Sequence, residues 1–245
     1  MMTYKQFSKS VKFVTKTSKV KSANSQAGFT IIESLMAIVV ASILLAAIAP
    51  VLTLSVATRV QAKRVELGTQ AARAYIDGVR SGAIIAPSHK ILLSEVSGNN
   101  KVFDSERVDF VKAGGTPTQN LSCASLTAGY CTNTATSSIY CINRDANSGC
   151  SGIQDFVIQA FRSTTSTTED DAEKGYILSV RVYRADAFNN GRALKIGEQQ
   201  ATFTGGLGNR QVPLIEVSTE VIPRNNDTNF GGDYNSYCER FGGCR

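Results

Sequence analysis

The hydrophobic positions of the chain form one long uninterrupted run and then a helical repeat. No residue from Ser34 to Thr58 is charged. A helix of about 25 residues, at 1.5 Å per residue, can cross a hydrocarbon layer about 30 Å thick. From 59 to 82, apolar residues recur at steps of three and four, and charged residues fill much of the opposite face. We therefore predict a single long helix whose first part (29–58) spans a membrane and whose second part (59–82) is amphipathic.

The second half of the chain contains short segments rich in β-branched and aromatic residues, which are typical of strands. The first two segments are separated by a polar link and predict a hairpin. In the last segment, polar residues alternate with apolar ones. Strands after a long helix predict an α+β fold, in which the amphipathic part of the helix packs on an antiparallel sheet of about four strands. The four expected strand segments are 155–161, 176–183, 193–203 and 212–222.

The remaining stretches set the expected boundaries. Residues 83–153 are rich in Ser, Thr, Asn and Gly and should form a variable loop region that contains Cys residues. We expect it to be a contact surface, since recognition often takes place on loops, although disulfide-linked packing explains it equally well. The sheet should occupy 154–223, and 224–245 should form a C-terminal tail held by its cysteines.

The positive charge of the chain is concentrated before the apolar run. The whole sequence has 26 Lys and Arg against 20 Asp and Glu, while residues 1–28 contain six Lys and no acid. Without this leader the balance is 20 against 20. The basic pI therefore predicts no nucleic-acid surface. Lysines before an apolar span instead keep that flank in the cytoplasm, so the C-terminal domain is expected in the periplasm of a single-pass inner-membrane protein.

All six cysteines follow the apolar run, which indicates export to an oxidising compartment and disulfide formation. Six cysteines allow fifteen connectivities. We expect local pairs, because the cysteines occur as sequence neighbours. Zinc binding by these thiols is the alternative to disulfides. However, the sequence has no CxxC pair, and its one histidine, His89, is far in sequence from the cluster of cysteines. The expected pairs are Cys123–Cys131, Cys141–Cys150 and Cys238–Cys244.

Glu33 stands at the start of the apolar helix, where an isolated carboxylate is unfavourable unless a cation pairs with it. The segment combines Gly28, Phe29 and Glu33 with a long apolar helix that contains Pro50. This arrangement beneath a basic leader resembles the N-terminus of type IV pilins and type II secretion pseudopilins. The alternative is a carboxylate that snorkels at the interface of an ordinary signal anchor, but it leaves the Gly-Phe-Thr before Glu33 unexplained.

The resemblance implies a sequence of events at this segment. A prepilin peptidase would cut between Gly28 and Phe29, and the new amino group of Phe29 would be methylated. Glu33 would then pair with the terminal ammonium of a neighbouring subunit during filament assembly. Pro50 cannot donate the helical hydrogen bond and is expected to bend or loosen the helix.

The same resemblance implies a structural role as a minor pilin or pseudopilin in a filament in the periplasm or at the cell surface. Its partners would be other pilins or pseudopilins, an assembly ATPase and an inner-membrane platform protein. The segments 28–82 and 214–223 look like cyanobacterial pseudopilins of hormogonium polysaccharide secretion, which implies polysaccharide export and gliding motility. The alternatives are a pilus-borne binding module for adhesion or DNA uptake, and a membrane-anchored exported domain that never polymerises.

No catalytic set is evident, and we expect no enzyme. His89 lies in a Pro-Ser-His-Lys loop and is expected to be solvated. We expect no cofactor either. Two stretches faintly resemble calcium loops, but Asn, Asp and Gly are also ordinary turn residues. These stretches are Asp145 to Gly149 with Asn147, and Asn225 to Asp233 with Asp227.

Overall fold

The computed structural model describes residues 28, 30–93, 109–118, 123, 126–132, 138–145, 149–164, 172–201 and 208–222. The chain divides into two compact units, Met1–Ile48 and Ala49–Arg245. The helix α1 (Ile31–Arg80) begins in the first unit and ends in the second.

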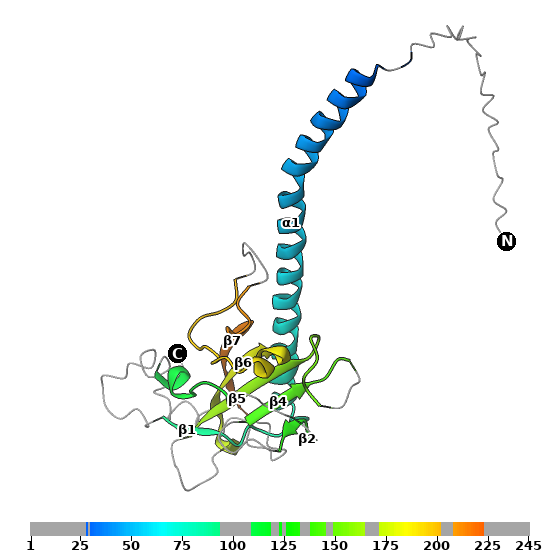
Figure 1. Cartoon of the computed structure of the whole chain (residues 1–245). Helices are drawn as coiled ribbons and strands as arrows, with labels where there is room; N and C mark the ends of the chain where they lie inside the picture. The colour runs from blue at the N-terminus through cyan, green and yellow to red at the C-terminus, as the bar shows by residue number, and fades with distance from the viewer. Residues whose placement is uncertain are drawn as a thin grey trace, which may run out of the picture. The chain divides into compact units, whose positions relative to one another are not determined.

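The second unit combines the C-terminal part of α1 with a seven-stranded sheet, which confirms the predicted α+β class (Figure 1). The strand order is β2-β3-β4-β5-β6-β7, and β1 pairs in parallel with the end of β5, whereas all other pairs are antiparallel. The strands are β1 (Lys90–Leu92), β2 (Leu126–Thr127), β3 (Tyr130–Cys131), β4 (Ser138–Ile142), β5 (Phe156–Thr164), β6 (Tyr176–Arg184) and β7 (Ile215–Val221). Residues 109–113 are helical, and the 3-10 helices are η1 (Ala172–Lys174) and η2 (Ala185–Asn190).

The predicted hairpin is confirmed as β5 and β6, and the predicted last strand as β7. Two expectations are wrong. The described part of 193–203 contains no strand, because residues there make isolated backbone bonds to a neighbouring loop: Lys195 N–H to the Gln211 carbonyl at 2.8 Å, and Gln200 N–H to the Pro213 carbonyl at 2.9 Å. In addition, β1 to β4 lie within 83–153, which was expected to be loop.

One face of the sheet packs on α1, and we call it the helix face. Apolar residues at alternate positions of β5 and β6 meet the buried stripe of α1 that includes Ala72, Tyr75 and Val79. The opposite face, which we call the far face, is also covered. There Phe161 and Ile177 pack against Phe110, and Val157 and Tyr183 belong to a cluster with the disulfides. Every residue of β5 and β6 is therefore buried.

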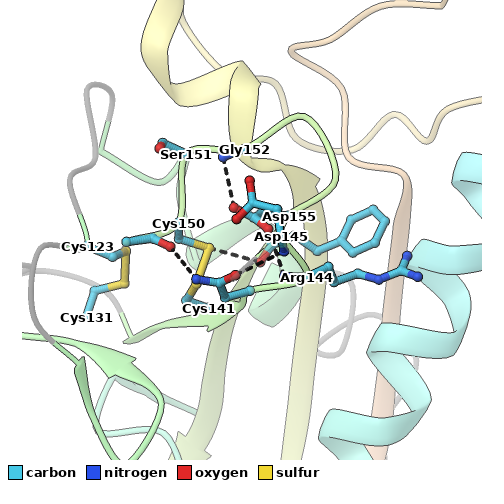
Figure 2. The surroundings of a disulfide bond; sticks show 12 residues. Cys123, Cys131, Cys141, Arg144, Asp145, Cys150, Ser151, Gly152 and Asp155 are labelled. Atoms are coloured by element: carbon cyan, nitrogen blue, oxygen red, sulfur yellow. Dashed lines mark hydrogen bonds between the residues drawn. A yellow bond between two sulfur atoms is a disulfide. The ribbon is translucent and has the colours of Figure 1, made fainter. Parts of the chain in front are cut away.

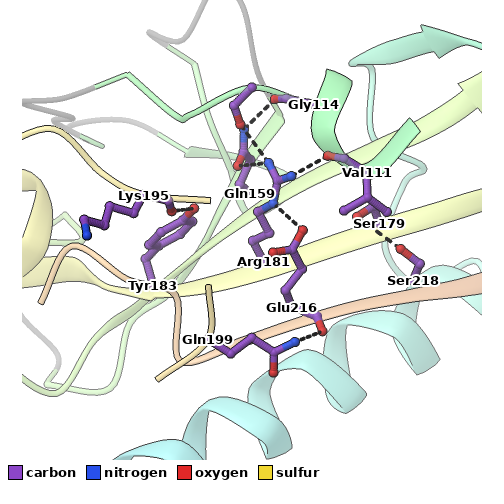
Figure 3. Close-up of polar contacts among 11 residues, drawn as sticks. Val111, Gly114, Gln159, Ser179, Arg181, Tyr183, Lys195, Gln199, Glu216 and Ser218 are labelled. Carbon is purple, nitrogen blue, oxygen red and sulfur yellow. Dashed lines mark hydrogen bonds and ion pairs between the residues drawn. The ribbon is translucent and has the colours of Figure 1, made fainter. Parts of the chain in front are cut away.

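A polar row crosses the centre of the far face (Figure 3). Gln159, Arg181 and Glu216 are directly paired across β5, β6 and β7. Arg181 is 0% exposed and donates to the carboxylate of Glu216, to the side chain of Gln159 and to the carbonyls of Val111 and Gly115. The buried guanidinium thus ties the segment 109–118 to the sheet.

Candidate functional site

The candidate site is the N-terminal end of α1, where the predicted cleavage and assembly residues lie. Gly28 is exposed, and an added side chain there would meet no atom within 4 Å. Phe29 lies outside the described residues. Thr30 caps the helix: its hydroxyl accepts the N–H of Glu33 at 3.3 Å, and its carbonyl accepts the N–H of Ser34 at 3.1 Å.

Glu33 is exposed in the first turn of α1. A carboxylate at this position interacts favourably with the positive end of the helix dipole. The acid at position 33 therefore has a local structural explanation, because Thr30-Ile31-Ile32-Glu33 has the Thr-x-x-Glu pattern of a capping box. The sequence analysis missed this role of Thr30, although an acid three positions after a threonine would have revealed it. The cap leaves the carboxylate itself accessible to a second partner.

The helix after Glu33 exposes a continuous apolar surface. Every residue from Ile31 to Val56 is exposed, and the side chain of Ile31 is 87% exposed. Among the described residues, α1 is the one helix long and apolar enough to cross a membrane. Because the exposure of so large an apolar surface to water is unfavourable, we expect lipid or other helices to cover it. The exposed large apolar residues of this run include Leu35, Met36, Ile38, Ile43, Leu44, Leu45, Ile48, Val51 and Leu52.

Pro50 lies inside α1, where it has no N–H to donate to the carbonyl of Ala46. The Pro50 carbonyl accepts the hydroxyl of Thr53 at 2.9 Å. The predicted bend or loosening of the helix at this proline stays a prediction.

Two of the predicted disulfides are present in the second unit (Figure 2). Cys123 pairs with Cys131 across a Cα–Cα distance of 4.9 Å, and Cys141 pairs with Cys150 across 5.9 Å. All four cysteines are buried in one cluster with Val157 and Tyr183. The pair Cys238–Cys244 lies outside the described residues.

The loop closed by Cys141 and Cys150 is organised by the buried carboxylate of Asp155 (Figure 2). Its two oxygens accept the N–H groups of Arg144 and Gly152, each at 2.8 Å. Asn143 forms an Asx turn, in which its side-chain oxygen accepts the N–H of Asp145 at 3.2 Å. These contacts are turn chemistry. Within the described ranges, no three or more His, Cys, Asp or Glu side chains group as metal ligands do. Asn147 and the second stretch, 225–233, lie outside them.

His89 is half-buried rather than solvated, because its ring packs edge-on against Phe161 with centroids 6.2 Å apart. Burial lowers the pKa of its imidazole. Its backbone carbonyl accepts the N–H of Arg162, and its own N–H donates to the hydroxyl of Ser138 at 2.8 Å. These contacts fix the start of β1 against β4 and β5.

Comparison with known proteins identifies the N-terminal segment. Residues 23–49 match the family described as "Prokaryotic N-terminal methylation motif". This match covers the last six residues of the leader, the predicted cleavage position and the first part of the apolar helix. Searches of curated proteins and of solved structures found no match to the chain.

Proposed function

Since residues 23–49 carry the prepilin-leader signature of type IV pilins and pseudopilins, we propose that the chain is a minor pilin or pseudopilin. It would be a structural subunit of a filament related to type IV pili or type II secretion pseudopili. The signature implies processing by a prepilin peptidase and assembly with other pilins. An apolar helix followed by a disulfide-bonded domain fits a single-pass membrane anchor with an exported domain.

The observation that carries this proposal is the exposed apolar surface of α1 between Ile31 and Val56. In the membrane this surface would contact lipid, and in the filament it would contact the same helix of neighbouring subunits. Glu33 is the carboxylate that would meet the methylated amino group of Phe29 from a neighbour. In the low dielectric between helices the two charges would attract strongly and relieve each other's burial.

In this proposal the chain performs no chemistry of its own. The energy for filament growth would come from an assembly ATPase acting through an inner-membrane platform protein. The finer role, polysaccharide secretion that drives gliding motility, rests on the resemblance of 28–82 and 214–223 to pseudopilins of that pathway.

The first experiment is mass spectrometry of the intact protein and its N-terminal peptide after extraction from the membrane. The proposal expects a chain that begins at N-methylated Phe29. A chain that retains the leader, or one cut beyond the apolar run, would contradict it. A deletion strain then separates the roles, because surface filaments, transformation and secreted polysaccharide can be scored independently. Loss of adhesion or DNA uptake with normal filaments and secretion would favour the binding-module alternative.

A further inference from the structure

Four arginines come together beside α1 shortly after the apolar run ends. Arg184 at the end of β6 donates twice to Asp186, at 2.9 and 2.5 Å, and Arg210 lies 3.8 Å from the same carboxylate. Arg210 and Arg192 line one cavity of about 660 Å³ together with Gly208, Asn209 and Gln211. We call Arg64, Arg184, Arg192 and Arg210 the basic collar.

Arg64 joins this group from the helix. Burial lowers the pKa of its guanidinium, and the positive charges of Arg184 and Arg210 lower it further. Asp186 has the opposite effect, so one carboxylate lies within reach of these guanidiniums. Arg64, Arg184 and Arg210 are three positive groups around the carboxylate of Asp186. An arrangement that brings like charges together is unfavourable by itself and favours the binding of an anion.

The collar lies at a defined level along α1. The loop that begins at Gly208 approaches α1 at Gln61, because a methyl group added to Gly208 would lie 3.2 Å from Cδ of Gln61. Gln61 and Arg64 follow Thr58, the last residue of the uncharged run, by three and six positions. At 1.5 Å per residue, the collar begins about 5 to 9 Å beyond the apolar surface. In a bilayer, that is the depth of the phospholipid headgroups.

We propose that the basic collar binds the phosphate groups of anionic phospholipids in the leaflet that faces the exported domain. This inference rests on the proposed membrane residence of the helix. Guanidinium groups suit phosphate because they offer several donors in a planar fork. Arg192 and Arg210 are exposed and would contact the headgroup, whereas Arg184 is 5% exposed and is held by Asp186. The exposed Arg59 and Lys63 of α1 add positive charge at the same level.

The collar would hold the domain against the membrane until the subunit is extracted. In the filament the apolar helix leaves the bilayer, so the collar must exchange its lipid phosphates for other partners. Lipid binding would thus favour the pool of subunits in the membrane over the assembled form.

The test uses the full chain in detergent micelles, titrated with short-chain phosphatidylglycerol, short-chain phosphatidylcholine or inorganic phosphate. The chain contains no tryptophan, so a single Gln211→Trp substitution beside Arg210 gives a fluorescence signal from the cavity. Native mass spectrometry of the chain without this reporter checks that the tryptophan itself does not create the site. We expect phosphatidylglycerol to bind more tightly than phosphatidylcholine and inorganic phosphate.

The variant R192E/R210E should weaken phosphatidylglycerol binding about tenfold or more, since two cations beside the anionic headgroup are replaced by anions. R192K/R210K should retain most of the binding. The matched control R73E/K112E changes the net charge equally at exposed positions outside the collar and should behave as the parent.

Equal binding of the two lipids, or no effect of R192E/R210E, would overturn the proposal. Phosphate binding as tight as that of phosphatidylglycerol would also overturn it and indicate a site for a soluble anion. Cleavage at Gly28 by a prepilin peptidase is measured on the same proteins. If the parent is processed but shows no lipid preference, the collar inference alone fails, whereas an unprocessed parent contradicts the proposed function.

Discussion

Nε of Arg181 lies 2.9 Å from Oε1 of Glu216, directly across β6 and β7, and the two side chains are 0% and 10% exposed. This ion pair is therefore nearly dry. Arg181 also stacks over the ring of Phe161, with Cζ 5.1 Å from the ring centroid. Because Arg181 donates to carbonyls of Val111 and Gly115 as well, the ion pair joins the sheet to a segment about 70 residues earlier in the chain.

Replacing Arg181 with Met should destabilise the second unit by about 3 to 5 kcal/mol, because the buried Glu216 carboxylate would lose its cation. The carbonyls of Val111 and Gly115 would also lose their donor. Urea unfolding of the full chain in detergent measures the change, and amide exchange should show faster opening of 109–118. The exposed Arg73 provides the control, since R73M should have little effect. Unchanged exchange in 109–118 would show that Arg181 does not hold this segment.

Gly114→Ala tests the same contact from the other side. An added methyl group would lie 2.3 Å from Cζ of Phe161, so the ring or the segment must move. We expect a destabilisation of about 1 to 3 kcal/mol, as for other overpacked cores. In a double-mutant cycle with Phe161→Leu the two effects should be non-additive. Ala113→Ser, at an exposed neighbour, is the control. Strict additivity would mean that the methyl group clashes elsewhere.

Much of the fold was predictable because its signals are local. An uncharged run of 25 residues and a three-to-four repeat predict α1 without knowledge of any partner. The short sequence separation of neighbouring cysteines also predicted the disulfides Cys123–Cys131 and Cys141–Cys150. β5, β6 and β7 are seven to nine residues long and rich in β-branched and aromatic residues, so they too were visible in the sequence.

The parts that escaped prediction depend on distant residues. The strands β1, β2 and β3 have only two or three residues each, and β1 is defined by its parallel pairing with β5, about 70 positions later. β4 carries a strand-like composition, but the Ser/Thr-rich surroundings hid it. The position of Arg181 in a strand predicted neither its complete burial nor its carbonyl partners, because those partners come from the segment 109–118, about 70 positions earlier in the chain. The basic collar was missed for the same reason.

The disulfides lead to a prediction about digestion. Trypsin cuts after Arg224 and Arg240, so a Cys238–Cys244 bond would keep 225–240 joined to 241–245 until reduction. Each disulfide adds about two mass units on reduction. Additional chymotrypsin cleavage after Tyr130 and Tyr140 separates Cys123, Cys131 and Cys141 and tests the other two pairs. A free 241–245 peptide before reduction would contradict the C-terminal pair.

Removing the bond Cys141–Cys150 by C141S/C150S should lower the free energy of unfolding by about 2.5 kcal/mol, as expected for a loop of this length. The loop also depends on Asp155, whose two oxygens accept backbone N–H groups of Arg144 and Gly152. In C141S/C150S the amide protons of Arg144 and Gly152 should therefore exchange with solvent faster than the amide protons of β6. Equal protection in parent and variant would show that Asp155 alone maintains the loop.

Buried tyrosines should make the domain unstable in alkali. Burial raises the pKa of Tyr75, Tyr130 and Tyr183 above the usual range. Above a pH of about 10 the unfolded state loses these protons while the folded state keeps them, so stability is fully present below that pH and falls as the pH rises. Each such tyrosine contributes a slope of up to about 1.4 kcal/mol per pH unit.

Tyr183→Phe tests this slope with little change in packing. The Tyr183 hydroxyl donates to the Lys195 carbonyl at 2.9 Å, so the variant should lose about 1 kcal/mol at neutral pH. Above a pH of about 10 the stability of the variant should fall less steeply than that of the parent, because its unfolding releases one proton fewer. Urea titrations between neutral and alkaline pH measure both quantities. Parallel curves would show that Tyr183 ionises normally in the folded domain.

The last prediction separates two roles of the Glu33 carboxylate. Close to the positive end of the helix dipole it stabilises the start of α1, where the Thr30 hydroxyl accepts the Glu33 N–H. As the proposed assembly residue it would pair with the amino group of Phe29 from a neighbouring subunit. E33Q keeps the backbone bond to Thr30 and removes the charge, whereas T30A removes the cap acceptor and keeps the charge. The cap contributes only about 1 kcal/mol, a small part of the stability of a 50-residue helix.

We therefore expect E33Q to be cleaved after Gly28 as the parent is, but to lower the amount of sheared surface filament about tenfold or more, since an unpaired ammonium buried between helices is strongly unfavourable. T30A should assemble nearly as well as the parent. Complementation of a deletion strain, with filament yield and the mass of the N-terminal peptide as readouts, measures both steps. If T30A and E33Q reduce assembly equally, the carboxylate acts through the helix cap. If neither does, the membrane-anchored domain does not polymerise through this residue.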